Sequence, residues 1–255
     1  MRLYVLLSLL LLIGGCNSNN DFESDLNQTK QYVATGEYQK AESLYKKMIK
    51  KYSDDAKVAA VYFLLGEFQE NSLTNVDDAK KSYESVIEKY GDTKLSKRAR
   101  INLAHIAKDE EDWEGAIYQY EELIRNNPDE PIFRVKLAES YIASENFEQA
   151  RIELGPILNN QMKLKPDVAA RALFVYAESF FMGKRYEEAR EQYQAIIRKF
   201  VDSEMTGETM IKIATCYEIE GYNDEAINWL KKAKPFFQNK AFIDKRLAGL
   251  KKRGK

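Results

Sequence analysis

Several residue types on which enzymes and metalloproteins depend are scarce in this sequence. Its 255 residues include one histidine, His105, and two cysteines, Cys16 and Cys216. A single histidine excludes a two-histidine zinc site, and the scattered glycines form no phosphate-binding loop. A serine or cysteine nucleophile would need His105 as its base, and no nucleophile-elbow motif is present. We therefore expect a non-catalytic protein with no catalytic residues and no metal site, in which Cys216 is a small core residue.

The N-terminal apolar run, Leu3–Ile13, is too short to span a bilayer, which takes about 20 residues. With Arg2 before it, the run is typical of a signal peptide over residues 1–15. Gly14 and Gly15 followed by Cys16 resemble the lipobox of bacterial lipoproteins. The resemblance implies cleavage after Gly15 and a lipid on the Cys16 sulfur, and we expect no other cofactor. The alternative is an ordinary signal peptide followed by a chance cysteine.

Charge is balanced overall but unevenly distributed. The whole chain has a net charge of −1, which excludes a general nucleic-acid binder. Residues 231–255 nevertheless contain ten lysines and arginines and one acid, Asp244, so the rest of the chain is acidic. This basic end has two interpretations. It is either the solvated face of a closing helix, or a surface attracted to anionic phospholipid or to an acidic partner.

The sequence contains six similar segments, each centred on an alanine. These alanines are 34 to 39 residues apart: Ala41, Ala79, Ala116, Ala150, Ala189 and Ala226. An aromatic or leucine residue follows each alanine by four positions: Tyr45, Tyr83, Tyr120, Leu154, Tyr193 and Leu230. Together with apolar residues three positions further on, these offsets trace one stripe of a helix. Each segment is therefore predicted to be an amphipathic helix, the second of a pair.

A second small residue lies about twelve positions before most of these alanines, in another periodic segment. The positions are Thr29, Gly66, Ala104, Ala138, Ala177 and Ala214. Small side chains on both segments predict closely packed antiparallel hairpins, with Gly36, Gly183 and Gly221 near the turns. The pattern resembles the tetratricopeptide repeat. The resemblance implies an all-α fold, a right-handed solenoid of about six hairpins with a C-terminal capping helix. The alternative is a coincidental pattern in another helical fold.

The expected domain organisation follows from these patterns. Residues 1–15 form the signal peptide, 16–24 a lipidated polar tether, 25–238 six repeats, and 239–255 a basic capping helix and tail. Pro156 follows Gly155 inside the fourth repeat's second helix, where proline removes a hydrogen bond. We therefore expect a kink there.

In the resembled family, the first helix of each hairpin lines the surface that binds ligands. The residues that the resemblance places on that surface are Phe63, Glu67, Val135, Glu139, Ile142, Phe174, Glu178, Phe181 and Met182. An apolar surface near Glu139 and Glu178 suits a helix or extended segment with apolar anchors and a basic residue. The alternative is that these side chains pack between neighbouring helices.

At the level of function, the lipobox and the repeats together are similar to BamD-type outer-membrane assembly lipoproteins. Repeat proteins associated with the Tol–Pal system share the helix endings KKYSDD, EKYGDT and RKFVDS. The resemblance implies a scaffold for envelope proteins, lipid-anchored at the periplasmic face of the outer membrane, with no nucleic acid or small-molecule substrate. A pilotin that delivers a secretin subunit is a second interpretation, and an adaptor for a peptidoglycan-active enzyme is a third.

Overall fold

The computed structural model describes the backbone of residues 15–53, 55–159 and 164–253, with side chains from residue 20 onward. Within these ranges the regular structure consists of thirteen α-helices and one short 3-10 helix, with no strand. The all-α prediction is therefore confirmed. Residues 1–14 and the side chain of Cys16, on which the signal peptide and the lipid were predicted, lie outside the description. The chain divides into two compact units, Met1–Leu103 and Ala104–Lys255.

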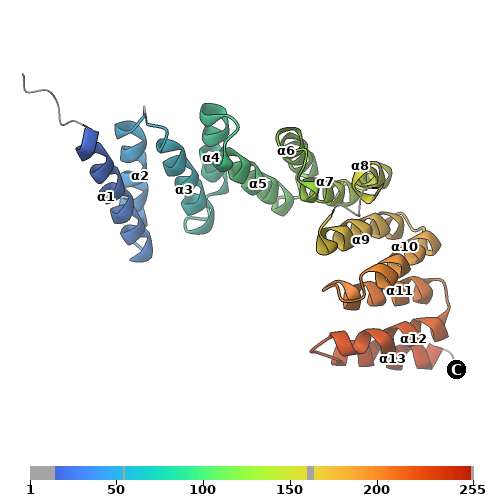
Figure 1. The fold of residues 1–255 in the computed structure, drawn as a ribbon. Helices are drawn as coiled ribbons and strands as arrows, with labels where there is room; N and C mark the ends of the chain where they lie inside the picture. The colour runs from blue at the N-terminus through green and yellow to red at the C-terminus, as the bar shows by residue number, and fades with distance from the viewer. Residues whose placement is uncertain (1–14, 54, 160–163, 254–255) are drawn as a thin grey trace, which may run out of the picture. The chain divides into compact units, whose positions relative to one another are not determined.

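The first unit is built from consecutive helical hairpins. Its helices are α1 (Gly15–Ala34), α2 (Tyr38–Lys51), α3 (Val58–Asn71), α4 (Val76–Tyr90) and the first part of α5 (Lys94–Asp109). Helix α1 packs against α2, and α3 packs against α4 (Figure 1). The helices therefore pair in chain order, as the repeat pattern predicts.

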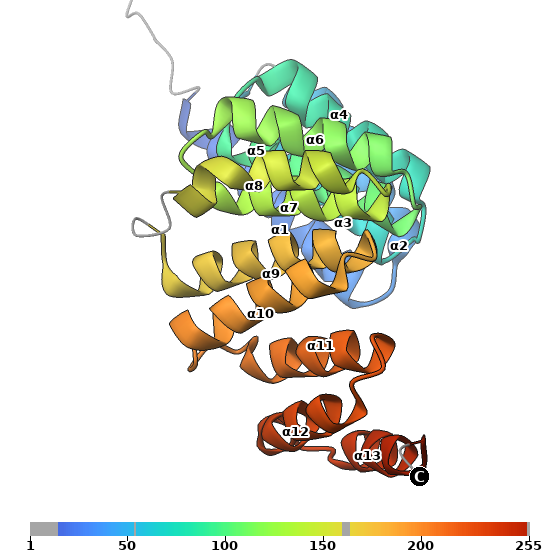
Figure 2. The ribbon, with the colours of Figure 1, turned by 90° about the vertical axis from the view of Figure 1, so that its right-hand side faces the viewer.

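The second unit continues the same arrangement. It contains the end of α5, then α6 (Trp113–Asn126), α7 (Pro131–Ala143), α8 (Phe147–Asn159), α9 (Pro166–Met182), α10 (Tyr186–Lys199), α11 (Thr206–Ile219), α12 (Asn223–Ala233), the 3-10 helix η2 (Lys234–Phe236) and α13 (Ala241–Arg253). Helices α9 to α13 follow one another as a stack (Figures 1 and 2). The last helix, α13, packs on α12 and closes this end of the unit with buried Ile243 and Leu250.

The repeated stripe is the core of both units. All six shared alanines are fully buried, and the aromatic or leucine residues four positions later are buried as well. The small residues of the first helices, Thr29, Ala104, Ala138, Ala177 and Ala214, are fully buried as well. Burial of these small side chains lets the two helices of a hairpin approach closely, and the aromatic residues fill the space beside them.

The second repeat is one residue out of register, and its turn explains why. In the other repeats, the amide that closes the turn bonds the carbonyl five residues back, as in Arg185 to Phe180 at 2.9 Å. In α3–α4, the amide of Asn75 instead bonds the carbonyl of Gln69, six residues back, at 2.8 Å. One extra residue in this turn accounts for Gly66 standing one position before the expected small site.

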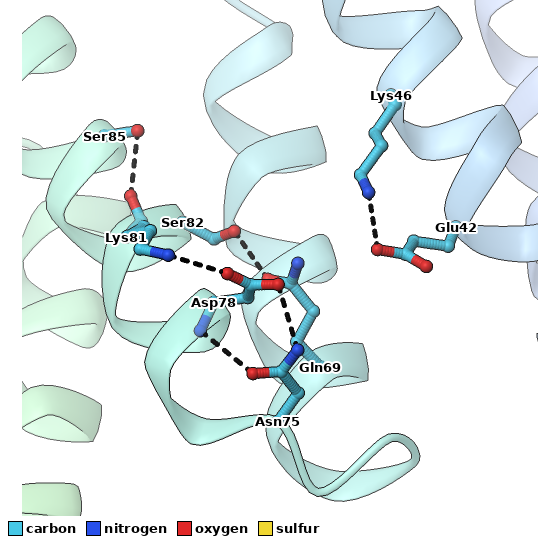
Figure 3. Close-up of polar contacts among 8 residues, drawn as sticks. All are labelled: Glu42, Lys46, Gln69, Asn75, Asp78, Lys81, Ser82 and Ser85. Carbon is cyan, nitrogen blue, oxygen red and sulfur yellow. Dashed lines mark hydrogen bonds and ion pairs between the residues drawn. The ribbon is translucent and has the colours of Figure 1, made fainter.

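The same hairpin carries a polar contact in its core. The hydroxyl of Ser82 donates a hydrogen bond to Oε1 of Gln69 at 2.6 Å, and both residues are buried (Figure 3). At the start of α4, the side chain of Asn75 accepts a bond from the amide of Asp78 and so caps the helix (Figure 3).

Each of the six hairpin turns has one residue with positive φ, always five positions before the shared alanine. These residues are Gly36, Thr74, Glu111, Glu145, Lys184 and Gly221. Gly36, Gly183 and Gly221 all lie at turns, as predicted, but of the three only Gly36 and Gly221 have positive φ. Gly183 has φ −74°, and the next residue, Lys184, adopts the left-handed conformation instead. Four turns therefore place a side chain where glycine is favoured.

The prediction of a polar tether at residues 16–24 needs correction. Helix α1 begins at Gly15, so these residues are helical rather than extended. Phe22 is buried, with its ring centroid 5.1 Å from that of Tyr52. Phe22, Leu26, Thr29 and Val33 are spaced by four and three residues, which extends the apolar stripe of the first hairpin toward the N-terminus.

Pro156 does not end its helix, because α8 continues to Asn159. The carbonyl that loses its partner is that of Ile152, four residues earlier. Ile152 is exposed, so water can reach this part of the helix. This exposure explains why proline is tolerated here.

Candidate functional site

The first helices of the hairpins in the second unit are linked by ion pairs. We define the A-helix face as Lys136, Glu139, Arg171, Glu178, Met182, Lys212 and Ile219, which lie on α7, α9 and α11. Glu139 of α7 pairs with Arg171 of α9 at 2.5 Å, and Glu178 of α9 pairs with Lys212 of α11 at 2.8 Å. These two contacts place the three helices side by side on one surface.

Three of the residues predicted to meet a ligand are buried instead. Phe63, Val135 and Phe174 are each 5% exposed or less. Phe63 packs on Tyr83 and Phe174 on Tyr193, with ring centroids 5.7 and 5.5 Å apart. The prediction that these side chains are presented to a partner is therefore wrong, and the alternative of packing between helices is correct for them.

The predicted acidic residues have partners within the chain. Glu139 accepts a bond from Lys136 at 3.0 Å as well as from Arg171, and Glu178 accepts bonds from Lys212 and the hydroxyl of Tyr193. In the first unit, Glu67 pairs with Arg98 at 3.1 Å. A basic residue of a ligand would therefore have to displace these lysines and arginines to reach the carboxylates. The A-helix face thus presents charges of both signs rather than a purely acidic surface.

Two buried tyrosines near these carboxylates, Tyr193 and Tyr120, differ in the hydrogen bonding of their hydroxyl groups. Burial raises the pKa of Tyr193, and the nearby charge of Glu178 and its hydrogen bond raise it further. Burial likewise raises the pKa of Tyr120 to about 12, with a smaller contribution from Glu139. The hydroxyl of Tyr120, however, has no hydrogen-bond partner. Tyr193 therefore fixes a carboxylate of the face, whereas Tyr120 only fills space.

Of the remaining predicted residues, Met182 belongs to the A-helix face, whereas Ile142 and Phe181 are not part of it as defined above. Ile142 and Phe181 are partly buried against the core, and Met182 is 49% exposed. The Nζ atom of Lys212 lies 4.8 Å from the ring centroid of Phe181, at cation–π distance. Charged and apolar side chains therefore interleave along α9 and α11.

Sequence reasoning missed Ile219, Arg171 and Lys212. Ile219 is 50% exposed and follows Ala214 by five residues, the offset by which Met182 follows Ala177. Because successive repeats stack, equivalent positions form a row along the surface. The offset of Met182 therefore carried the signal for Ile219.

The ion pairs continue from α11 to the last helix. Arg246 of α13 donates to Glu218 at 2.7 Å and to the hydroxyl of Thr215 at 3.1 Å, and Arg253 pairs with Glu218 at 3.1 Å. Both arginines of residues 231–255 are thus engaged with α11.

The described residues contain no cluster of histidine, cysteine and carboxylate side chains that could hold a metal ion. Cys216 is buried, and this burial raises the pKa of its thiol to about 11, so it is a core residue as predicted. His105 is exposed on α5. Among the helices described, none is long and apolar enough to cross a membrane.

Sequence profiles of the tetratricopeptide repeat match the chain at residues 107–170 and at residues 60–93 and 171–203. The comparison with curated proteins finds no match.

Solved structures show the same fold at low sequence identity. A tetratricopeptide repeat protein from Parabacteroides merdae is 18% identical with a TM-score of 0.59, covering 91% of this chain and 99% of that one. The apo form of RapI is 17% identical with a TM-score of 0.62, covering 91% and 71%. YrrB, described as having an unusual peptide-binding site, is 15% identical with a TM-score of 0.51, covering 78% and 95%.

Proposed function

Because the chain belongs to the tetratricopeptide-repeat family, whose profiles match just over half of it, we propose that it is a non-catalytic scaffold that binds other proteins. We place the binding surface on the A-helix face of the second unit. A peptide-binding site in a protein of similar fold, YrrB, supports this use of the architecture.

One observation carries the proposal. Met182 and Ile219 are half exposed at equivalent positions of α9 and α11, on the sides of these helices that carry the ion pair of Glu178 and Lys212. Exposed apolar side chains next to charges of both signs suit an amphipathic segment, which buries its apolar residues and matches the charges at their edge. The partner is therefore a helix or extended segment with apolar anchors flanked by mixed charge.

A direct test uses substitutions that leave the core intact. Met182→Asp with Ile219→Asp should abolish capture of partner proteins by the tagged full chain, as measured by affinity purification and mass spectrometry. The matched control is Tyr118→Asp with Ile152→Asp, at equally exposed positions of α6 and α8. Partners that are lost only in the control would contradict the assignment to the A-helix face. Phe174 is unsuitable for this test because its replacement would disturb the core.

The lipobox at Gly14-Gly15-Cys16 supports a second part of the proposal, attachment to a bacterial envelope membrane. A single acyl chain anchors a protein only marginally, whereas two or more make the attachment stable. We place the scaffold at the periplasmic face of the outer membrane, in a complex similar to those that assemble outer-membrane proteins. Palmitate labelling of the wild type that disappears in Cys16→Ala would support the anchor, and labelling that persists would remove it.

A further inference from the structure

The basic C-terminal segment presents lysines and phenylalanines together. Within residues 231–255 the exposed lysines are Lys231, Lys232, Lys240, Lys245, Lys251 and Lys252. Phe236 and Phe242 are 52% and 56% exposed, and among the described residues they are the two phenylalanines exposed to this extent. We name Phe236, Lys240, Phe242, Lys245 and Lys252 the basic edge. Within α13, helical spacing places Phe242, Lys245 and Lys252 toward one side of the helix. Two exposed phenylalanines close together in the sequence favour an interacting surface over a face that is only solvated.

The single acid of this segment is already neutralised. Asp244 pairs with Lys234 at 2.5 Å, which also ties η2 to α13. The arginines behave differently from the lysines, since Arg246 and Arg253 both bind Glu218. What remains available for a ligand is therefore a set of lysines, which attract negative charge without the fixed geometry that arginine imposes.

The phenylalanines are held in place by close packing beneath them. A Cβ atom at Gly207 of α11 would lie 2.7 Å from Cβ of Phe236 and 3.0 Å from the ring of Phe237, so η2 rests directly on the backbone of α11. Phe237 packs in the core formed with Ile243 and Leu250. The backbone of Phe236 is therefore held in place while its ring is exposed to solvent. The core that contains Ile243 and Leu250 likewise holds α13, the helix that carries Phe242.

We propose that the basic edge binds the surface of an anionic phospholipid bilayer. Phe236 and Phe242 would enter the boundary between headgroups and acyl chains, and Lys240, Lys245 and Lys252 would lie among the lipid phosphates. An acidic protein surface is less suited to the edge, because arginine recognises fixed carboxylates best. Both arginines of this segment, Arg246 and Arg253, already pair with Glu218. The proposal concerns residues outside the A-helix face and does not depend on the function proposed above.

Binding to vesicles tests this directly. The full chain carrying Cys16→Ser, which removes the lipidation site, is mixed with vesicles of phosphatidylcholine alone or with phosphatidylglycerol added. The apolar N-terminal run is present in every sample, so the preference for anionic over neutral vesicles is the quantity measured. We expect a preference of about tenfold or more at about 0.05 M salt that is lost at about 0.5 M.

Matched variants assign that preference to the basic edge. Lys240→Glu, Lys245→Glu and Lys252→Glu together should abolish the preference, whereas Lys30→Glu, Lys47→Glu and Lys50→Glu, exposed lysines of the first unit, should preserve most of it. Phe236→Ser with Phe242→Ser should weaken binding, and Tyr118→Ser with Ile152→Ser should not. In Phe242→Trp, anionic vesicles should shift the tryptophan emission to the blue. Equal binding to both vesicle types, an equal loss in the two lysine variants, or binding only to an acidic protein would overturn the proposal.

Discussion

Gly66 lies directly against the ring of Tyr83, so that a Cβ atom at Gly66 would be 2.7 Å from Cε1 and 2.9 Å from Cδ1 of the tyrosine. Tyr83 is fully buried, and its hydroxyl donates to Glu70 at 2.7 Å, so the ring is fixed at both ends. The extra residue in the α3–α4 turn shifts the point at which the two helices come closest to position 66. Glycine is required there because even the methyl group of alanine would be too large.

Gly66→Ala should therefore lower the free energy of unfolding by about 1–3 kcal/mol, since the ring or the helices must move apart. Gly249→Ala in α13 is the matched control, because nothing lies within 4 Å of a Cβ atom there. The control should gain up to about 1 kcal/mol from alanine's higher helix propensity. Urea unfolding followed by circular dichroism measures both. A neutral Gly66→Ala would contradict the close approach.

The left-handed turn residues make a second pair of predictions. Thr74 has φ 51°, which is strained for a β-branched side chain, and Gly221 has φ 85°. Thr74→Gly should raise the melting temperature, with a gain of up to about 1 kcal/mol, and Gly221→Ala should lower stability by about 1 kcal/mol. Glu84→Gly, at an exposed position in the middle of α4, serves as the control and should destabilise. A destabilising Thr74→Gly would show that the turn carries no strain.

The unpaired hydroxyl of Tyr120 predicts a stabilising deletion. Tyr120→Phe removes a buried polar group without a partner and should raise stability at neutral pH by about 1 kcal/mol. Tyr193→Phe should do the opposite, since it removes the bond to Glu178. Chemical denaturation of the two variants at pH 7 compares them. Equal effects would mean that the two hydroxyls have similar surroundings.

The same tyrosine gives a pH dependence. The pKa of Tyr120 is raised to about 12 in the folded protein, against about 10 in an unfolded chain. The unfolded state therefore loses its proton first, and stability is retained below pH about 10 and falls as the pH rises toward 12. The decline should be shallower in Tyr120→Phe. A decline of the same steepness in both proteins would contradict this assignment.

The N-terminal residues provide a test of helix against tether. Phe22→Ala should destabilise the first hairpin by about 3 kcal/mol, because its ring is buried against Tyr52. Glu23→Ala, exposed on the same helix, should have little effect. Hydrogen exchange of the α1 and α2 amides measures the loss locally. Unchanged protection of these amides in Phe22→Ala would instead support a tether that does not pack on the first hairpin.

The sequence predicted the hairpins well because their determinants are local. The alanine of each second helix and the residue four positions later are buried in every repeat, since the period of an α-helix requires them to share a face. The turn conformations were less predictable. Lys184 adopts positive φ beside Gly183, which shows that the fixed offset from the second helix, not the presence of glycine, sets which residue has positive φ in the turn.

The candidate site was predicted only in part. The resemblance located the helices of the face, but it assigned Val135 and Phe174 to the surface although both fill the space between consecutive hairpins. Periodicity separates buried from exposed sides of one helix, whereas packing between hairpins depends on how they stack. The partners of Glu139 and Glu178 come from the following repeat, 32 and 34 residues away, where sequence spacing alone gives no distance.

The central claim is that α9 and α11 present a protein-binding surface. A photo-crosslinking amino acid placed at position 182 or 219 in living cells tests it most directly, with positions 118 and 152 as the comparison. We expect discrete protein adducts from positions 182 and 219 and none from positions 118 and 152. Adducts formed only from positions 118 and 152 would contradict it.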